Sequence, residues 1–219
     1  MTERDALIRS WDRNAGNWIR VVRQGLIRSR RAGPDDAVLN AIAELAPKRL
    51  LDIGCGEGWL VRAAVARTGC GAVGIDGAAA LIDAARAADA MNTYQMMDYD
   101  SFAASDIGGD FDVAVFNYSL FVDDVVPLLR AAAKRLAPGG AVVIQTPHPG
   151  DGREDGWRVE DFSAFDGGDW ATMPWYYRTL ESWRTVLREA GLEIRKMREP
   201  AAEDGRVLSL LMICVPIQA

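Results

Sequence analysis

Hydrophobic residues at the start of the chain recur at helical spacing. The recurring positions, three or four residues apart, are Leu7, Trp11, Ala15, Trp18, Val22 and Leu26. This stripe predicts an amphipathic helix whose apolar side packs on the rest of the molecule. Gly33 and Pro34 then break it and begin a second helix with acids in its first turn, which Pro47 ends. The pattern therefore predicts N-terminal helices over residues 1–46.

Short apolar runs alternate with helical patterns from residue 47 onward. Strands are expected at residues 49–53, 72–75, 93–96, 111–116 and 141–145. Helices fit between most of them, at residues 60–65, 81–88 and 122–136, the last closed by Pro138. This alternation predicts an α/β fold with a doubly wound parallel sheet.

The last third of the chain carries a different pattern. A helix is expected over residues 179–190, and strands over residues 192–197 and 207–215. The turn at residues 202–205 suits an antiparallel hairpin. The expected sheet is therefore mostly parallel and finishes with an antiparallel pair. We interpret residues 1–219 as one domain, with a cofactor-binding core at 47–149 and the last helix and hairpin at 179–219.

Composition and charge narrow the function classes. The 219 residues are 49% hydrophobic and 26% charged, which is typical of one globular domain. A net charge of −6 argues against an extended nucleic-acid interface, and the Arg-dense stretch at residues 20–31 is interpreted as a solvated helix face. Three cysteines at no metal or disulfide spacing indicate reduced thiols and no metal site. Without an apolar leader or membrane span, a cytoplasmic location is expected.

A glycine-rich turn follows the first expected strand, where an adenosine cofactor lies in this type of fold. Gly54 and Gly56 allow a tight turn and a close approach of a ligand. Their spacing is G-x-G-x-G rather than the G-x-G-x-x-G of pyrophosphate binders, and carboxylates flank the turn at Asp52 and Glu57. Because S-adenosylmethionine carries a sulfonium, an amino group and no phosphate, the acids favour this methyl donor over NAD.

Two further acids follow the next strands. Asp76 comes 22 positions after Gly54 (76 minus 54) and ends the second strand, where a carboxylate can accept hydrogen bonds from ribose hydroxyls. Asp98 follows the third strand and can accept from the adenine amino group. An aspartate at a strand end also often caps the next helix, and this alternative is a serious one for Asp98.

Five segments together resemble the class I (Rossmann-like) S-adenosylmethionine-dependent methyltransferases, in particular the small-molecule branch that includes the ubiquinone-pathway enzymes. The segments are LLDIGCGEG, VGID, MMDYD, FDVAVFNYSLF and LAPGGAVVIQTP. The resemblance implies a seven-stranded sheet with an antiparallel last strand, S-adenosyl-L-methionine as cofactor and S-adenosyl-L-homocysteine as product. It also implies an opening helix that closes over the cofactor, to which WDRNAGNW is similar, although simple packing also accounts for its two tryptophans. The candidate cofactor-binding residues are Trp18, Asp52, Gly54, Cys55, Gly56, Asp76, Gly77, Asp98, Tyr99, Asn117 and Tyr118.

The acceptor is expected over the carboxyl ends of the strands. Tyr118 and Ser119 stand where the family's N-methylating nucleic-acid enzymes carry two prolines, which argues against a base-flipping enzyme. The only histidine, His148, follows the fifth strand and is the candidate base for a phenol or carboxylic acid. A rigid loop residue is the alternative, since a reactive sulfonium needs alignment more than a base.

Residues 150–178 form a long insertion that is expected to be a lid or a binding wall. Its aromatic residues are Trp157, Phe162, Phe165, Trp170, Trp175, Tyr176 and Tyr177. They indicate a flat or apolar acceptor, and packing on the sheet is the alternative. The candidate substrate contacts are Trp11, Phe121, Trp175, Tyr176 and Arg178, the last as the partner of an acceptor carboxylate.

The sequence thus predicts methyl transfer from S-adenosylmethionine to a small-molecule acceptor, aromatic or carboxylate-bearing. A non-catalytic S-adenosylmethionine-binding module or sensor is an alternative. An NAD-dependent oxidoreductase on the same fold is disfavoured by the glycine spacing and by the lack of a Tyr-x-x-x-Lys pair. The acceptor, the methylated atom and the oligomeric state stay open.

Overall fold

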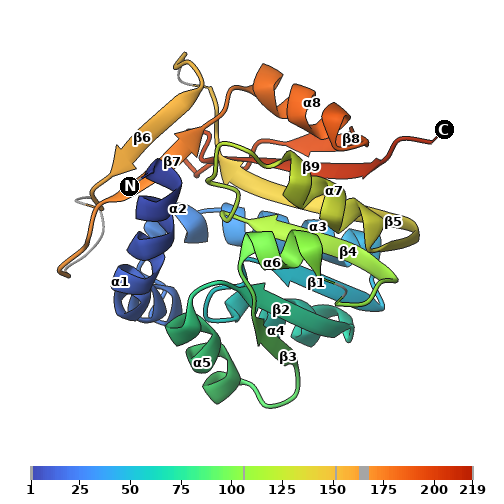
Figure 1. Cartoon of the computed structure of the whole chain (residues 1–219), viewed down its shortest axis with the longest axis horizontal. Coiled ribbons are helices and arrows are strands. Elements are labelled where there is room, and N and C mark those ends of the chain that lie inside the picture. The colour runs from blue at the N-terminus through green and yellow to red at the C-terminus, as the bar shows by residue number, and fades with distance from the viewer. Residues whose placement is uncertain (1, 106, 151, 163–167, 219) are drawn as a thin grey trace.

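A computed structural model describes residues 2–105, 107–150, 152–162 and 168–218. Its centre is a seven-stranded sheet in the order β3-β2-β1-β4-β5-β9-β8 (Figure 1). The strands are β1 (Arg49–Ile53), β2 (Gly71–Asp76), β3 (Thr93–Met96), β4 (Phe111–Asn117), β5 (Leu136–Pro147), β8 (Leu192–Arg198) and β9 (Ser209–Pro216). Strands β1 to β5 pair in parallel, and β9 runs antiparallel to both of its neighbours. The predicted fold class is confirmed.

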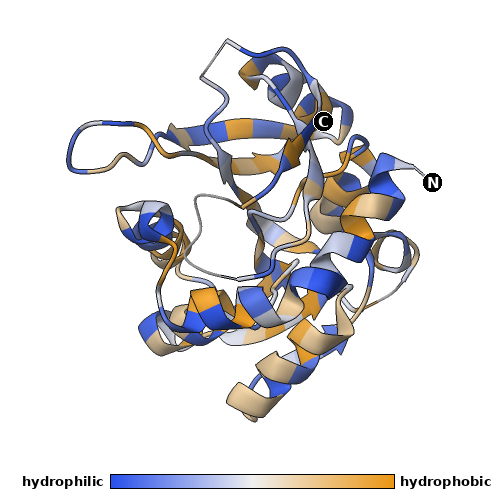
Figure 2. Cartoon of the chain, turned by 90° about the vertical axis from the view of Figure 1, so that its left-hand side faces the viewer, coloured by the Kyte–Doolittle hydropathy of each residue, from blue (hydrophilic) through white to orange (hydrophobic). Residues whose placement is uncertain are grey.

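Helices cover both faces of this sheet. They are α1 (Glu3–Arg23), α2 (Arg28–Arg31), α3 (Pro34–Leu45), α4 (Trp59–Thr68), α5 (Ala79–Ala88), α6 (Tyr99–Ala104), α7 (Val126–Lys134) and α8 (Leu180–Glu189). Apolar side chains of α3, α4 and α5 form one cluster with the sheet, and those of α6, α7 and α8 form another. Hydrophobic and hydrophilic bands on the same helices are visible in Figure 2. None of the helices in the described ranges has the length and apolar character needed to cross a membrane.

Strand β1 shows why the sequences of the central strands are nearly continuous apolar runs. Leu50 belongs to the cluster on the α3 and α4 side, whereas Leu51 and Ile53 belong to the cluster on the opposite side. Because both faces are covered, alternate residues of the strand are buried in opposite directions. Asp52 shares the Leu50 side and is the one charged residue of the strand's buried part.

A second, two-stranded sheet lies inside the insertion. It consists of β6 (Gly156–Glu160) and β7 (Met173–Tyr177), which pair antiparallel with Arg158 opposite Trp175 and Glu160 opposite Met173. It lies beside α1 in Figure 1, and α1 also packs against α5. The sequence predicts an aromatic lid or wall in this insertion but not β6 and β7. No short turn motif stands between the two strands to indicate a hairpin.

Three helices differ from what the sequence predicts. The short helices α2 and α6 were not expected, since each is too brief to show a periodic pattern. Helix α7 begins at Val126 and ends at Lys134, so Pro138 does not close it. Instead, Leu136 already pairs with Phe111, and residues 136–140 belong to β5 across an irregularity in the pairing.

Candidate functional site

A cavity of about 700 Å³ opens at the carboxyl ends of β1, β2 and β4, with α1 and the β6–β7 sheet as further walls. This size is typical of a small-molecule or cofactor site. The predicted site residues that line it are Trp11, Trp18, Gly54, Cys55, Gly56, Asp76, Gly77, Asp98, Tyr99, Asn117, Tyr118, Phe121 and Trp175. The four that do not line it are Asp52, His148, Tyr176 and Arg178. Topology thus brings residues from 11 to 175 to one place.

The glycine turn between β1 and α4 requires glycine for two different reasons. Gly54, Gly56 and Gly58 all have positive φ, at 79°, 56° and 81°. A Cβ on Gly54 would lie 2.4 Å from the Cβ of Ser119, whereas one on Gly56 would meet nothing within 4 Å. Gly56 therefore leaves open space on the cavity side, where a ligand can approach the backbone closely.

The Asp76 carboxylate is held in place by the turn that it faces. One oxygen accepts a hydrogen bond from the Gly56 amide at 2.9 Å, and the other accepts from the Ala78 amide at 2.8 Å. Burial raises the pKa of Asp76, and these two N–H groups oppose the increase. A carboxylate has about four acceptor sites, so this anchored group can still accept hydrogen bonds from a ligand.

Asp98 fulfils the helix-capping alternative and also lines the cavity. Its Oδ1 accepts from the Ser101 amide at 2.7 Å and caps α6, and hydrogen bonds from Ser101 lower the pKa of the carboxyl. The neighbouring Tyr99 donates its hydroxyl to the carbonyl of Ser119 at 2.5 Å. Ser119 in turn donates to the carbonyl of Ile53 at 2.7 Å, which connects the loop after β4 to the end of β1.

Asp52 lies beneath the glycine turn and does not line the cavity. Its side chain is buried, and neither carboxylate oxygen has a hydrogen-bond partner among the described residues. Burial raises the pKa of Asp52 to about 8, the nearby Asp76 carboxylate adds to the increase, and Arg30 opposes it. A buried acid without a partner is unfavourable for stability, which makes this position a candidate for interaction with a ligand cation.

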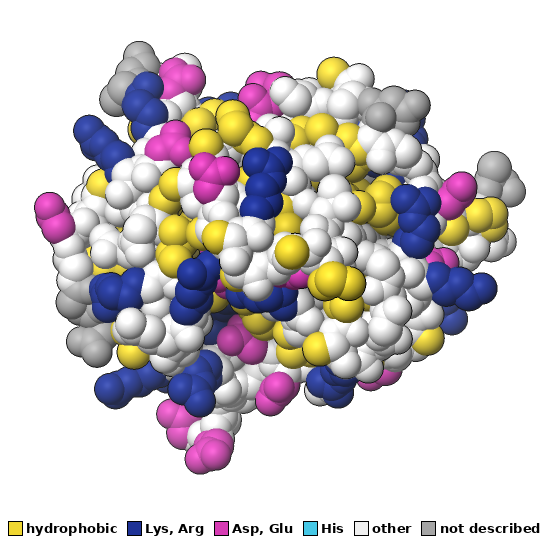
Figure 3. Space-filling model, turned by 90° about the horizontal axis from the view of Figure 1, so that it is seen from below, with side chains coloured by type: hydrophobic (Ala, Val, Ile, Leu, Met, Phe, Trp, Pro, Cys, Tyr) yellow, Lys and Arg dark blue, Asp and Glu magenta, His cyan; other side chains and the backbone are white. Residues whose placement is uncertain are grey.

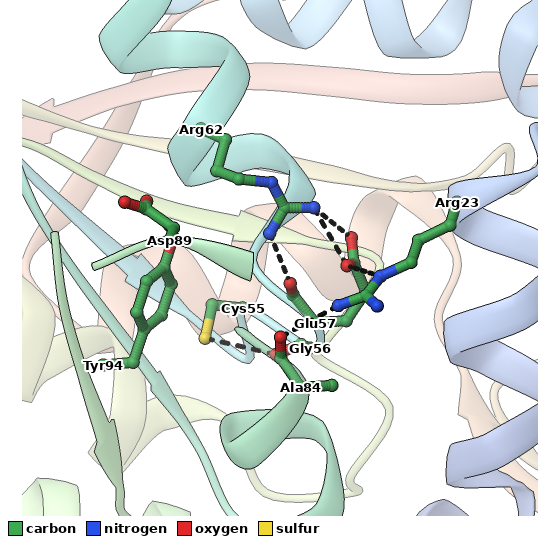
Figure 4. A network of polar contacts seen from close by, with 8 residues as sticks. All are labelled: Arg23, Cys55, Gly56, Glu57, Arg62, Ala84, Asp89 and Tyr94. Atoms are coloured by element: carbon green, nitrogen blue, oxygen red, sulfur yellow. Dashed lines mark hydrogen bonds and ion pairs between the residues drawn. The ribbon is translucent and has the colours of Figure 1, made fainter. Parts of the chain in front are cut away.

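Glu57 joins the glycine turn to two helices (Figure 4). Its buried carboxylate accepts two hydrogen bonds from Arg62 of α4 at 2.8 and 2.9 Å, and one from Arg23 of α1 at 2.8 Å. Arg23 also donates to the carbonyl of Ala84 in α5 at 2.8 Å. The end of α1 is therefore fixed to the turn that it covers. The sequence suggested Glu57 only as an acidic neighbour of the cofactor.

The Arg-dense stretch is not merely a solvated face, as the sequence suggested. Arg30 of α2 lines the cavity, donates to Asp35 at 3.1 Å and is only 16% exposed in its side chain. Its guanidinium lies 4.9 Å from the ring centre of Trp59 and 5.5 Å from that of Tyr118. Since α2 must fold back over the turn to make these contacts, no local spacing in the sequence predicts them.

Aromatic side chains of α1, the loop after β4 and the insertion form a further wall of the cavity. Trp11 stacks on Phe121 with ring centres 6.3 Å apart, and Phe121 meets the edge of Trp175 at 5.9 Å. Trp18 packs edge to face with Phe162 and Trp170. Trp11 and Trp18 line the cavity and pack on other rings. Packing by the two tryptophans is therefore confirmed, and closure of the helix over the cofactor stays a prediction.

Three predicted residues point elsewhere. His148 pairs with Glu199 at 3.0 Å on the loop after β8, outside the cavity. Arg178 is buried and donates to the carbonyls of Val122 and Asp123, so its guanidinium fixes the loop after β4 and does not face an acceptor. Tyr176 packs on Trp157 on the other side of the small sheet, because alternate residues of β7 face opposite ways. Phe165 lies outside the described residues.

Comparison with known proteins decides the family. Residues 26–197, most of the chain, match the model of a family described as a methyltransferase domain. This chain belongs to the methyltransferase-domain family. Solved structures share its fold, among them an S-adenosylmethionine-dependent methyltransferase from Mesorhizobium loti (TM-score 0.60, 24% identity, 80% of this chain and 95% of that one). A 1,6-didemethyltoxoflavin-N1-methyltransferase from Burkholderia thailandensis aligns with TM-score 0.69 and 17% identity over 98% of this chain and 88% of its own.

Curated relatives match part of the chain. A ubiquinone biosynthesis O-methyltransferase from Ralstonia nicotianae is 34% identical over 117 residues, 50% of this chain and 48% of its own. The protein of that name from Neisseria meningitidis is 32% identical over 109 residues, 48% of this chain and 46% of its own. The chain thus spans about half the length of the curated relatives it matches.

Proposed function

We propose that this protein transfers a methyl group from S-adenosylmethionine to a small-molecule acceptor. The observation that carries the proposal is the position of Asp76, whose carboxylate is held by the glycine turn at the edge of a 700 Å³ cavity. Membership in the methyltransferase-domain family supports the same activity. The two ubiquinone biosynthesis O-methyltransferases and the 1,6-didemethyltoxoflavin-N1-methyltransferase described above support a small-molecule acceptor.

The residues present fit this cofactor. The turn leaves open space at Gly56, and the orphaned oxygens of Asp52 and Asn117 offer acceptors that no described residue occupies. Carboxylates on this side of the cavity match the positive charges of a sulfonium and an amino group. A pyrophosphate would meet the same carboxylates unfavourably, which supports S-adenosylmethionine over NAD.

Each part of the cofactor has a suitable partner in this arrangement. Asp76 would accept hydrogen bonds from the ribose hydroxyls, and Asp98 would accept from the adenine amino group. The backbone at Gly54 and Gly56 would contact the methionine portion. Arg30, which lines the cavity, would face the carboxylate group of that portion, and Asp52 would act on its amino group from beneath the turn.

When bound, S-adenosylmethionine supplies a methyl group on an electrophilic sulfonium. The chain then has to align an acceptor nucleophile with that methyl group and exclude water. Trp11, Phe121 and Trp175 form the apolar wall that would hold a flat acceptor there. Because His148 is outside the cavity, the proposal uses positioning and no histidine base.

The proposed acceptor is a small aromatic or carboxylate-bearing molecule, and the proposed location is the cytoplasm. Cationic and acidic side chains are interspersed on the face shown in Figure 3, and no continuous basic patch gathers there. Nucleic acid binding relies on such clustered positive charge. This distribution and the net charge of −6 support a small molecule as the partner of one methyltransferase domain.

Calorimetric titration tests the cofactor assignment. We expect S-adenosylhomocysteine to bind the wild-type protein and NADH not to bind. Asp76→Ala should raise the dissociation constant of S-adenosylhomocysteine about tenfold or more through the loss of charge-assisted hydrogen bonds. Asp83→Ala, an exposed acid on α5, is the matched control and should leave it unchanged. Equal affinity of the Asp76 variant and the wild type would contradict the ribose assignment.

A radiolabelled methyl-transfer assay separates the enzyme from a binding-only module. Acceptor-dependent transfer of the label from S-adenosylmethionine would support the enzyme. Tight nucleoside binding with no transfer to any compound of an aromatic and carboxylate panel would favour the non-catalytic alternative.

A further inference from the structure

We propose that Arg158 on β6 selects an acceptor that is planar and carries an anionic group. This inference rests on the proposed function, because it assigns the substrate class of the same cavity. The juxtaposition that carries it is a guanidinium beside the aromatic wall, on the side of the cavity away from the glycine turn. The sequence had assigned this role to Arg178, which the fold turns elsewhere.

The β6–β7 sheet presents one face to the cavity. Arg158 stands directly opposite Trp175, and Glu160 stands directly opposite Met173. Positions two apart on a strand share a face, and all four of these residues line the cavity, as does Val159 between Arg158 and Glu160. The ring centre of Trp175 lies 5.9 Å from that of Phe121 and 6.0 Å from that of Tyr177, and the Arg158 guanidinium lies 5.8 Å from the ring centre of Tyr177. The guanidinium is therefore at the end of this row of rings. A flat ring placed on that wall would bring a substituent toward Arg158.

The Arg158 guanidinium is oriented but not neutralised. Its Nη1 donates to the carbonyl of Trp157 at 2.9 Å, and its Nη2 donates to the carbonyl of Glu154 at 2.7 Å. The plane also lies 5.8 Å from the ring centre of Tyr177. No carboxylate of the described residues forms an ion pair with it. Because a guanidinium has five N–H groups, three remain to donate to an anion in a fixed plane.

Charged side chains are unevenly distributed around the cavity. The acids Asp12, Asp76 and Asp98 line the side near the glycine turn together with Arg30, whereas Arg158 and Glu160 line the side near the small sheet. An anionic group of the acceptor would be attracted to the Arg158 guanidinium and repelled by Asp76 and Asp98.

Glu160 fixes the direction in which such an acceptor would lie. It is two residues from Arg158 on the same face of the strand, so the two backbone positions are about 7 Å apart. Its Oε1 accepts from the Phe162 amide at 2.9 Å, which holds the carboxylate in place. An anion would be repelled by Glu160 and would bind at Arg158, leaving Glu160 to accept a hydrogen bond from a hydroxyl or amine.

A matched pair of probes tests the charge requirement. We would titrate protein saturated with S-adenosylhomocysteine with 2-naphthoate and with its neutral analogue 2-naphthamide. Wild-type protein should bind 2-naphthoate about tenfold more tightly, and Arg158→Gln should abolish that preference while changing the affinity for 2-naphthamide less than about threefold. Arg206→Gln, an exposed arginine in the turn between β8 and β9, is the control and should change neither affinity.

The titration distinguishes a failure of the inference about Arg158 from a failure of the proposed function. If S-adenosylhomocysteine itself does not bind, the cofactor assignment fails. If it binds but wild-type protein binds neither probe, or does not prefer 2-naphthoate, the inference about Arg158 is overturned. An equal loss of affinity for both probes in Arg158→Gln would overturn it as well. A third probe, 2-naphthyl phosphate, distinguishes the sources of the anion: tighter, Arg158-dependent binding of it supports the site and assigns the anion to a phosphate ester.

Discussion

The two sides of the cavity are built by different means. The proposed cofactor side consists of strand ends and backbone groups, with Asp76 held by the amides of Gly56 and Ala78. The proposed acceptor side consists of side chains that α1 and the β6–β7 sheet bring together from distant parts of the chain. A turn with positive φ accepts few residue types, whereas an apolar wall can be formed by many combinations of side chains. We therefore expect the first side to vary little among methyltransferases of this fold and the second to vary with the substrate.

Substitution in the glycine turn should have the largest effect. Gly54→Ala adds a Cβ 2.4 Å from Ser119 at a φ of 79°, so we expect a loss of about 3 kcal/mol in the free energy of unfolding. Gly69→Ala has a similar φ of 72° but no atom within 4 Å of the added Cβ, and should lose only about 1 kcal/mol. Urea denaturation of both variants measures the difference. Equal losses would mean that close packing at the turn is unimportant.

Asp52 should make the protein without cofactor less stable as the pH rises. Its pKa of about 8 in the folded protein, against an ordinary 3.8, means that the folded state retains a proton that the unfolded state releases between these values. We therefore expect the free energy of unfolding to fall by about 3 kcal/mol between pH 5 and pH 8. Asp52→Asn should remove most of this slope in denaturation experiments at the two pH values. A slope unchanged in Asp52→Asn would refute the assignment.

These two predictions concern Gly54 and Asp52, which the sequence alone identifies as candidate site residues. The glycine spacing, the acids after β2 and β3 and the order of the strands along the chain are local patterns. The structure places each of these features where the sequence predicts it. Arg30 and Arg158 could not be identified in this way, since their roles depend on how α2 and β6 fold against distant segments. Arg178 and His148 have suitable chemistry near the expected strands, but their side chains contact other partners in the structure, which the sequence does not show.

The connection between the two sides can be weakened at Arg23. Arg23→Gln removes the hydrogen bond between α1 and Glu57, while Arg62 still holds the Glu57 carboxylate. Because α1 covers the cavity, we expect the dissociation constant of S-adenosylhomocysteine to rise about threefold to tenfold, with a stability loss below about 1 kcal/mol at this partly exposed pair. Arg13→Gln on the same helix serves as the control. An unchanged affinity in calorimetry would show that the position of α1 is set elsewhere.

The smallest effect is expected at His148. Its imidazole pairs with Glu199 outside the cavity, so His148→Ala should change the turnover number less than about twofold. A general base would instead contribute roughly 10²–10⁴-fold. Steady-state kinetics with any accepted substrate distinguishes the two, and a loss in the larger range would restore the histidine as the catalytic base.

The division of the cavity is tested most directly by a crystal structure with S-adenosylhomocysteine bound. We expect ribose hydroxyls within hydrogen-bond distance of the Asp76 carboxylate, the homocysteine portion against Gly54 and Gly56, and the sulfur facing the aromatic wall. A nucleoside bound instead against Arg158 and Trp175, with the space at Gly56 left open, would contradict the division of the cavity into a cofactor side and an acceptor side.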